Sequence, residues 1–315
     1  AEQKAARENV AMFDYSMLGK LMVEGAGAES YLQRLCTNDM AMPVGGMAYS
    51  LMLNEQGGIE SDVTIARHSA DSFMVMSGIS HTRRDHDHLR RHIRHGEDIR
   101  LRDVTTSYAV LAIAGPNSPR LLAAVTDIDL SNDAFPPYHM RHTHIGHAPV
   151  FAQRLSFTGE TGWEIFVTPD FAEHVLDVIL EAGQPLGLQL AGGEALNALR
   201  IEKGFLHWGA DMAYTEAPYQ LGLDFICKPG KTLPFIGQDA CLARKADPKG
   251  PCLRSVRLAD PDAILHHNEP VLRDGQIIGF VTSGAFCAMQ KAAVGLCLVS
   301  PPDGTGGFKA VEDGA

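Results

Sequence analysis

A hairpin signal at residues 52–65 constrains the fold of this chain more than any other stretch. The sequence Met52-Leu-Asn-Glu-Gln-Gly-Gly-Ile-Glu-Ser-Asp-Val-Thr-Ile65 places paired glycines between two apolar, alternating segments. Because Gly57 and Gly58 can adopt positive φ, the chain can reverse tightly there. Asp62 would then be held on a rigid strand edge, which suits a catalytic acid or base. The simpler alternative is that Asp62 only caps the hairpin by accepting hydrogen bonds from backbone N–H groups.

The length and charge of the chain exclude several classes of protein. With 315 residues, 45% hydrophobic and 21% charged, it can bury a sizeable core and form two or three domains. Its net charge of −11 argues against a general nucleic-acid-binding protein. No run reaches the length of a membrane-spanning helix, and the first residues lack a signal-peptide pattern. Six scattered cysteines indicate free thiols, so we expect a cytoplasmic protein, or a mitochondrial matrix protein in a eukaryote.

Hydrophobic periodicity predicts an α+β chain that ends in a small all-β unit. Alternating apolar residues predict strands at residues 13–23, 49–53, 63–66, 73–77, 108–114 and 150–157. Helical spacing predicts helices at about residues 28–35, 82–95, 118–125, 171–182 and 194–203. After a linker that follows Lys245, only short strands are predicted, at residues 253–258, 270–272, 276–282 and 293–299.

Two cofactor-like patterns are better explained by ordinary structure. Gly25-Ala-Gly-Ala-Glu-Ser30 follows a strand and opens a helix, but Ser30 replaces the third glycine of a dinucleotide fingerprint. His88, His92 and His95 share one face of the predicted helix, yet no acidic or cysteine partner of recognised spacing accompanies them. A solvated basic helix is therefore favoured over a metal site. An intermediate interpretation is that its arginines attract an acidic partner or a polyglutamate tail.

An acid within an apolar strand is the second candidate functional residue. Glu164 follows Trp163 in an alternating segment, where an outward-facing strand residue is the simpler interpretation. The functional interpretation is a bidentate pair with a pterin ring, whose 2-amino group and ring N–H both donate to one carboxylate. Trp163 and the tyrosines, Tyr49 among them, would supply an apolar or stacking wall. Arg200 is a further binding candidate, although pairing with a buried acid as a scaffold is favoured for it over ligand contact.

Three segments in this order resemble the aminomethyltransferase (glycine-cleavage T-protein) superfamily. They are the hairpin at 52–65, Gly159-Glu-Thr-Gly-Trp-Glu-Ile165 and Leu199-Arg-Ile-Glu-Lys-Gly-Phe-Leu-His-Trp-Gly-Ala-Asp211. The resemblance extends over nearly the whole chain, as far as Gly275-Gln-Ile-Ile-Gly-Phe-Val-Thr-Ser283. In the T-protein itself an arginine precedes the Leu-Arg-x-Glu motif, whereas this chain has Leu196. That difference favours the folate-binding portion of dimethylglycine and sarcosine dehydrogenases.

The resemblance implies a three-lobed ring, with two α+β lobes and a C-terminal β-barrel. It predicts a discontinuous folate-binding lobe at residues 1–48 and 140–245 and an inserted α+β lobe at residues 49–139. A small barrel domain is expected at residues 246–315, either complete or without its last strands, for which the tail is short. The chain would be either a domain of a longer flavoenzyme or a divergent stand-alone member.

The function that the resemblance implies is tetrahydrofolate-dependent one-carbon transfer from an N-methyl or aminomethyl donor, forming methylene- or methyl-tetrahydrofolate. Asp62 matches the catalytic acid of the family and Glu164 its pterin-binding glutamate, while Ser61 replaces the first acid of the motif. Asp62 would orient the attacking folate nitrogen and take or shuttle its proton.

The implied partners are a small N-methyl donor or an aminomethyl carrier, and no nucleic acid or membrane. FAD is expected only if a separate domain or partner supplies it, and no metal is expected. An alternative function is a folate-binding regulatory module without catalytic turnover. A purely structural interaction domain would leave the ordered motifs unexplained.

Overall fold

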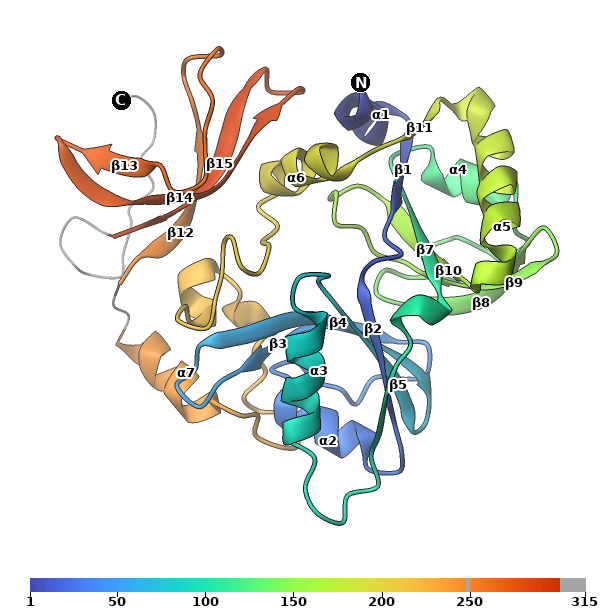
Figure 1. Cartoon of the computed structure of the whole chain (residues 1–315), viewed down its shortest axis with the longest axis horizontal. Coiled ribbons are helices and arrows are strands. Elements are labelled where there is room, and N and C mark those ends of the chain that lie inside the picture. The colour runs from blue at the N-terminus through green and yellow to red at the C-terminus, as the bar shows by residue number, and fades with distance from the viewer. Residues whose placement is uncertain (248–249, 301–315) are drawn as a thin grey trace.

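The chain forms three lobes, each built on one β-sheet (Figure 1). The computed structural model describes residues 1–247 and 250–300. Two of the lobes combine helices with a sheet, and the third consists of strands. Within the described residues, no helix is both long enough and apolar enough to cross a bilayer. All six cysteines are free, and only Cys227 is not buried.

The first lobe contains a six-stranded sheet that draws on distant parts of the chain. Its strand order is β11 (Leu188–Leu190), β1 (Val10–Asp14), β7 (Ala109–Ala114), β10 (Gly162–Val167), β9 (Ala148–Gln153) and β8 (Met140–Ile145). Only the β1–β11 pair is parallel. The helices of this lobe are α1 (Glu2–Glu8), α4 (Ser118–Ala123), α5 (Pro169–Gly183) and α6 (Gly193–Glu202). Apolar residues of α4 and α5 cover one face of the sheet.

The second lobe contains a five-stranded antiparallel sheet with the predicted hairpin at one edge. Its order is β3 (Met47–Leu53), β4 (Ile59–Ser69), β5 (Ser72–Ser77), β2 (Gly19–Glu24) and β6 (Arg100–Asp103). Gly57 has φ of 77° in the β3–β4 connection, as the sequence predicts for a tight reversal. Helices α2 (Ala28–Leu35) and α3 (Thr82–Arg91) supply buried side chains to the core on one face of this sheet.

The third lobe is an antiparallel sheet that follows helix α7 (Gln238–Ala246). Its order is β12 (Cys252–Arg257), β15 (Ala292–Val299), β14 (Gln276–Cys287) and β13 (Pro270–Arg273). Over residues 250–300 these strands form an open sheet, with no pairing of β12 to β13 to close a barrel. Short 3₁₀ turns lie in the segments between the lobes at Thr105–Ser107, Pro218–Leu221 and Asp224–Ile226, and within the first lobe at Gln184–Leu186.

The sheets divide the first two lobes differently from the predicted boundaries. The strand predicted at 13–23 is two strands, β1 and β2, which belong to different sheets. The inserted lobe therefore runs from β2 to β6, about residues 19–103, and not over residues 49–139. Nearly every residue of β1 and β2 is buried, so the apolar run gave no sign of the turn between them.

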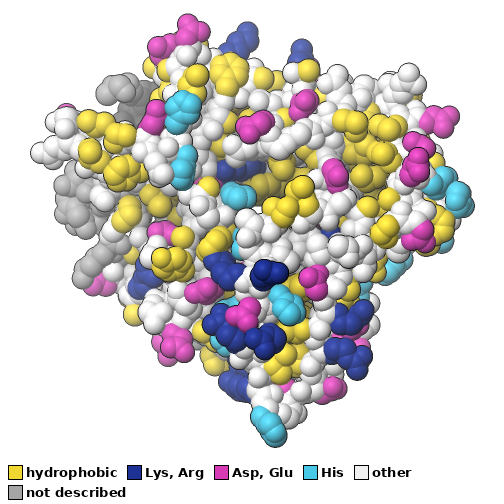
Figure 2. Space-filling model, viewed as in Figure 1, with side chains coloured by type: hydrophobic (Ala, Val, Ile, Leu, Met, Phe, Trp, Pro, Cys, Tyr) yellow, Lys and Arg dark blue, Asp and Glu magenta, His cyan; other side chains and the backbone are white. Residues whose placement is uncertain are grey.

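The basic helix α3 is only partly solvated. Basic side chains gather in the lower middle of the face shown in Figure 2, where α3 lies in the same view of Figure 1. On this helix, Arg90 and Arg91 pair with Asp87 at 3.1 and 3.0 Å. Its other side buries Asp85, His88 and Leu89. The prediction of a solvated basic helix therefore holds for the outer face of α3 and was wrong for its inner face.

Candidate active site

Asp62 and Glu164 project from two sheets toward one interior region. Side chains alternate along a strand, so Asp62 shares a face of β4 with Ala66, and Val63 points to the opposite face. Ala66 belongs to an apolar cluster to which both large sheets contribute, whereas Val63 packs in the core beneath α2 and α3. Glu164 shares a face of β10 with Phe166, which lies in the same two-sheet cluster. The fold thus directs both predicted acids to the junction of the first two lobes.

Asp62 is half-buried and hydrogen-bonded to a neighbouring strand. The hydroxyl of Tyr49, on β3, donates to Asp62 Oδ2 at 3.0 Å. Burial raises the pKa of Asp62 to about 6, and the nearby His81 and the Tyr49 hydrogen bond oppose that rise. Burial, followed by the Asp62 charge, holds the pKa of Tyr49 well above its usual value, so Tyr49 remains a donor. A carboxyl group that titrates near neutral pH can both accept and release a proton.

Glu164 is a buried acid to which no hydrogen-bond donor of the described residues is directed. Its exposed fraction is 6%, and among the described residues its carboxyl group makes no hydrogen bond or ion pair. Burial raises the pKa of Glu164 to about 8, and the charge of Lys20 opposes the rise. The Lys20 ammonium itself donates to the carbonyl oxygens of Ser16 and Leu18, each at 2.8 Å. A buried carboxyl group in this state is destabilising unless a donor reaches it.

A second unpartnered polar side chain lies beside Glu164. Gln153, on β9, pairs directly with Glu164 across the antiparallel strands. It is fully buried, and neither its amide nitrogen nor its amide oxygen has a hydrogen-bond partner in the described structure. Native interiors rarely leave such groups unsatisfied. The pair therefore fits a polar ligand that carries adjacent N–H donors.

Trp163 does not face the same region as Glu164. As the preceding residue of β10 it points to the other side of the sheet, where it is fully buried in the core formed with α4 and α5. There its ring lies 6.4 Å from that of Phe135 and 5.0 Å from the Arg154 guanidinium. Trp163 thus cannot form the wall that the sequence suggested without a change of strand register.

Arg200 occupies a scaffold position. On α6, its guanidinium donates to the side chains of Asn197 and Ser283 at 3.0 and 2.7 Å and to the side chain of Asp211. It also donates to the carbonyl oxygen of Phe205 at 3.0 Å. The side chains of Arg200 and Asp211 are 4% and 0% exposed. The donors of Arg200 are thus engaged within the protein, as in the scaffold interpretation, and we leave it out of the ligand site.

The structure adds a polar network that sequence reasoning missed. His81 Nδ1 lies 2.7 Å from Asp85 Oδ2, and Ser61 donates to the same oxygen at 2.9 Å. The Trp208 ring lies 5.2 Å from that of His81, and its indole N–H donates to the carbonyl oxygen of Ile59 at 3.0 Å. The available signal was the i, i+4 spacing of His81 and Asp85 where the helix begins.

Those later histidines do not form a metal site in the described structure. The rings of His88 and His92 lie 4.4 Å apart, and His92 Nδ1 is 2.7 Å from the carbonyl oxygen of His88. His95 lies beyond the end of α3 at Arg91. No group of three His, Cys, Asp or Glu side chains in residues 1–247 and 250–300 has the geometry to hold a metal ion.

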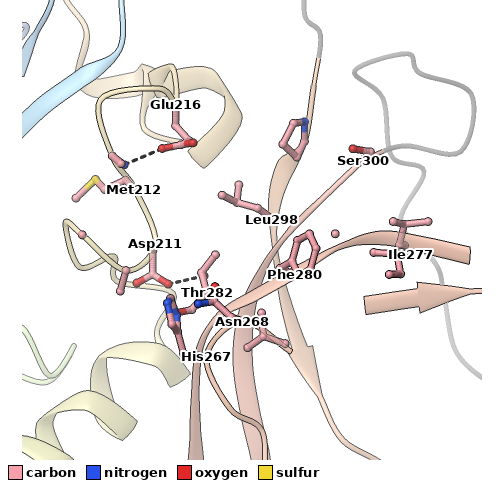
Figure 3. Close-up of a pocket in the computed structure, with 17 residues that line it drawn as sticks. Asp211, Met212, Glu216, His267, Asn268, Ile277, Phe280, Thr282, Leu298 and Ser300 are labelled. Carbon is pink, nitrogen blue, oxygen red and sulfur yellow. Dashed lines mark hydrogen bonds between the residues drawn. The ribbon is translucent and has the colours of Figure 1, made fainter. Parts of the chain in front are cut away.

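Two cavities flank the third lobe, away from the two acids. One, of about 540 Å³, lies between residues 209–216 and β14, where Thr282 donates to Asp211 at 2.6 Å (Figure 3). The other, of about 470 Å³, is lined by residues that include Arg200 and His207. Neither Asp62 nor Glu164 lines either cavity.

Family models match both parts of this architecture. Residues 1–231 match the GCVT N-terminal domain, and residues 252–312 match the glycine cleavage T-protein C-terminal barrel domain. The chain belongs to the glycine cleavage T-protein family. The aminomethyltransferase T of Bartonella henselae has the same fold, with a TM-score of 0.84 and 24% identity over 95% of this chain and 80% of that one. The predicted fold class is confirmed.

Similar proteins fall into two groups. An aminomethyltransferase of Clostridium botulinum (strain Loch Maree / Type A3) is 32% identical, over 95% of this chain and 80% of that protein. The 4-methylaminobutanoate oxidase (formaldehyde-forming) of Paenarthrobacter nicotinovorans is 38% identical, over 95% of this chain and 36% of the oxidase. The mitochondrial dimethylglycine dehydrogenase of Rattus norvegicus is 33% identical, over 93% of this chain and 34% of the dehydrogenase. The chain thus spans about a third of the length of the oxidase and the dehydrogenase.

Proposed function

We propose that this chain binds tetrahydrofolate and transfers a one-carbon unit to it from an N-methyl or aminomethyl donor. Glu164 carries the proposal, because it is a buried carboxyl group without a hydrogen-bond donor, and its face of β10, like the face of β4 that carries Asp62, contributes to the apolar cluster between the two sheets. A pterin ring offers the two adjacent N–H donors that one carboxylate accepts. Relatives named aminomethyltransferase and dimethylglycine dehydrogenase support this choice of chemistry.

Each residue of the proposed site has a distinct role. Glu164 holds and orients the pterin, and the positive charge of Lys20 favours its ionised form. Tyr49 fixes the direction of the Asp62 carboxyl group through its hydrogen bond. Bound tetrahydrofolate supplies the amine nitrogen that accepts the one-carbon unit. Asp62 accepts the proton that this nitrogen releases and stabilises positive charge on the donor.

We further propose that a flavin-containing domain or partner generates the one-carbon unit. The oxidase and the dehydrogenase each extend well beyond the part that this chain matches. Oxidation of an N-methyl group needs an electron acceptor. FAD bound by that separate unit would be the acceptor. The non-catalytic folate-binding module remains the second candidate, because Glu164 alone accounts for binding. A transfer assay with an aminomethyl donor distinguishes the two.

Calorimetry with tetrahydrofolate is expected to show saturable binding that strengthens as the pH rises from 6 to 8. Burial raises the pKa of Glu164 to about 8, so most of the ligand-free protein is protonated there at pH 7. Glu164 must lose that proton to accept two N–H donors, and affinity therefore rises by up to about tenfold per pH unit below the pKa. Titrations in buffers of different ionisation enthalpy would count the released proton. Absence of saturable binding to the wild-type protein would reject the proposed function.

Trp163→Phe is the matched control for the ligand site. The Trp163 ring packs on the opposite side of β10 from Glu164, so folate affinity should change by less than about twofold. The smaller ring leaves a gap in the core and is expected to lower the free energy of unfolding by about 1–2 kcal/mol. Chemical denaturation and calorimetry measure the two effects separately. Strong loss of affinity in this variant would place the pterin on the other face of the sheet.

A further inference from the structure

His81 bridges the two faces of the second sheet at the end of β5. Its Nδ1 lies 2.7 Å from the carboxylate of Asp85, on the face covered by α3. Because a carboxylate only accepts hydrogen bonds, Nδ1 carries the proton, and Nε2 is left for a second partner. Both His81 and Asp85 are buried. The Asp85 side chain, itself held by Ser61, therefore fixes the orientation and the tautomer of the imidazole ring.

The free edge of the His81 ring lies on the Asp62 side of the sheet. Val63 pairs with Ser77, the last residue of β5, and continuing this antiparallel register by one residue places Gly78 opposite Asp62. A Cβ atom on Gly78 would lie only 2.5 Å from His81 Nε2. Opposed residues of an antiparallel pair have Cβ atoms about 4.5–5.5 Å apart on one face. The imidazole thus occupies the space of a Gly78 side chain, next to the carboxyl group of Asp62.

We propose that His81, oriented by Asp85, is a positioning residue that keeps Asp62 ionised and passes its proton onward. This proposal rests on the proposed function, since it assigns a partner to the catalytic acid. When His81 is protonated, Nε2–H faces the Asp62 carboxylate. When it is neutral, Nε2 accepts the proton that Asp62 has taken from the substrate amine, and the Asp85 carboxylate balances the resulting imidazolium. The proton then passes from Nε2 to water or to the departing amine, which restores the neutral imidazole of His81.

The other titratable groups around this pair have defined places. Tyr49, from β3, donates to Asp62. From α3, Asp85 holds His81, and Arg84 lies 3.6 Å from Asp85 and 3.5 Å from the centre of the Trp208 ring. His207, after α6, has a pKa lowered by burial first and also by the charges of Arg200 and His81. The charge of His81 opposes the burial that raises the pKa of Asp62, in agreement with the geometry.

An NMR titration of the Asp62 carboxyl carbon tests this proposal. The protein is free of ligand and is labelled with ¹³C-aspartate. The signal of this carbon is assigned with Asp62→Asn. His81→Gln is expected to raise the pKa of Asp62 by roughly one unit, because it removes an opposite charge. The transfer rate of this variant should fall by up to about tenfold near pH 6 and recover above pH 8. An Asp62 titration identical to that of the wild type would overturn the proposal.

Two further variants separate this effect from damage to the fold. Gly78→Ala keeps His81 but pushes its ring away through the 2.5 Å contact, so it should raise the pKa of Asp62 in the same direction. His88→Gln alters a buried histidine of the same helix that packs on His92, and it should leave the Asp62 titration unchanged. The NMR result does not depend on folate. A wild-type protein without folate binding would therefore reject the proposed function and still leave the His81 proposal decided by titration.

Discussion

Asp62→Asn is expected to lower the rate of one-carbon transfer by roughly 10²–10⁴ while folate affinity stays nearly constant. Asparagine keeps the size of the side chain and can still accept the Tyr49 hydrogen bond. It loses the negative charge and the capacity to accept a proton, and both are used in the transition state. Single-turnover kinetics with a saturating one-carbon donor would measure the loss. Calorimetry would show that the folate site is intact.

The alternative for Asp62 is a purely structural role in the β3–β4 hairpin. In that case Asp62→Asn should leave the transfer rate unchanged and alter the free energy of unfolding by less than about 1 kcal/mol. Tyr49→Phe is the matched control, because it removes one hydrogen bond to Asp62 and keeps the carboxylate. Its rate loss should be well below that of Asp62→Asn. Equal losses of transfer rate in Asp62→Asn and Tyr49→Phe would show that both variants disturb the local structure, and that the Asp62 carboxylate has no chemical role of its own.

Glu164→Gln is expected to weaken tetrahydrofolate binding by roughly 2–4 kcal/mol, or about 30- to 1000-fold. A glutamine oxygen accepts one N–H donor, whereas its amide group repels the second. The loss should be measured at pH 8, where the wild-type carboxyl group is about half ionised before binding. Unchanged affinity would remove Glu164 from the pterin site and would leave its burial without a function.

The same substitution should make the ligand-free protein more stable. Burial raises the pKa of Glu164 from an ordinary 4.5 to about 8 in the folded state. The folded protein therefore binds more protons than the unfolded chain between these values, and stability falls as the pH rises through that window. Glutamine removes this dependence, with a gain on the order of 4 kcal/mol at pH 8 and little change at pH 4. Weaker binding by a more stable protein would exclude misfolding as the cause.

The sequence predicted the fold class and led to both acids, because each rests on a local signal. Gly57 does adopt the positive φ that the hairpin needs, and Glu164 does lie inside an apolar strand. The orientation of Trp163 was deducible from strand alternation, since adjacent residues cannot share a face. Its aromatic character does not determine which face of the strand it occupies. Here the physical constraint was the better guide.

Other features depend on tertiary structure and had no local signal. The separation of β1 from β2 follows from which sheet each strand joins, and both strands are buried on both faces. The approach of His81 to Asp62 depends on the register of β5 and on the missing side chain of Gly78. The lack of partners around Gln153 is likewise visible only when every neighbour is in place. A single sequence cannot supply these relations, because none is encoded within one element.

The buried pairing of Arg200 with Asp211 has a consequence for how the lobes move. Arg200 belongs to α6 beside the first sheet, and its guanidinium also holds Ser283 in β14 of the third. Swinging the third lobe outward would break the hydrogen bonds that this pair makes to β14, from Arg200 to Ser283 and from Thr282 to Asp211. A buried polar group that loses its hydrogen-bond partner costs about 1–3 kcal/mol. Unfolding of the third lobe is thereby coupled to unfolding of α6, the helix beside the first sheet that carries Arg200. The lobes should melt as one cooperative unit, so that a hinge between them is not a low-energy route for substrate entry.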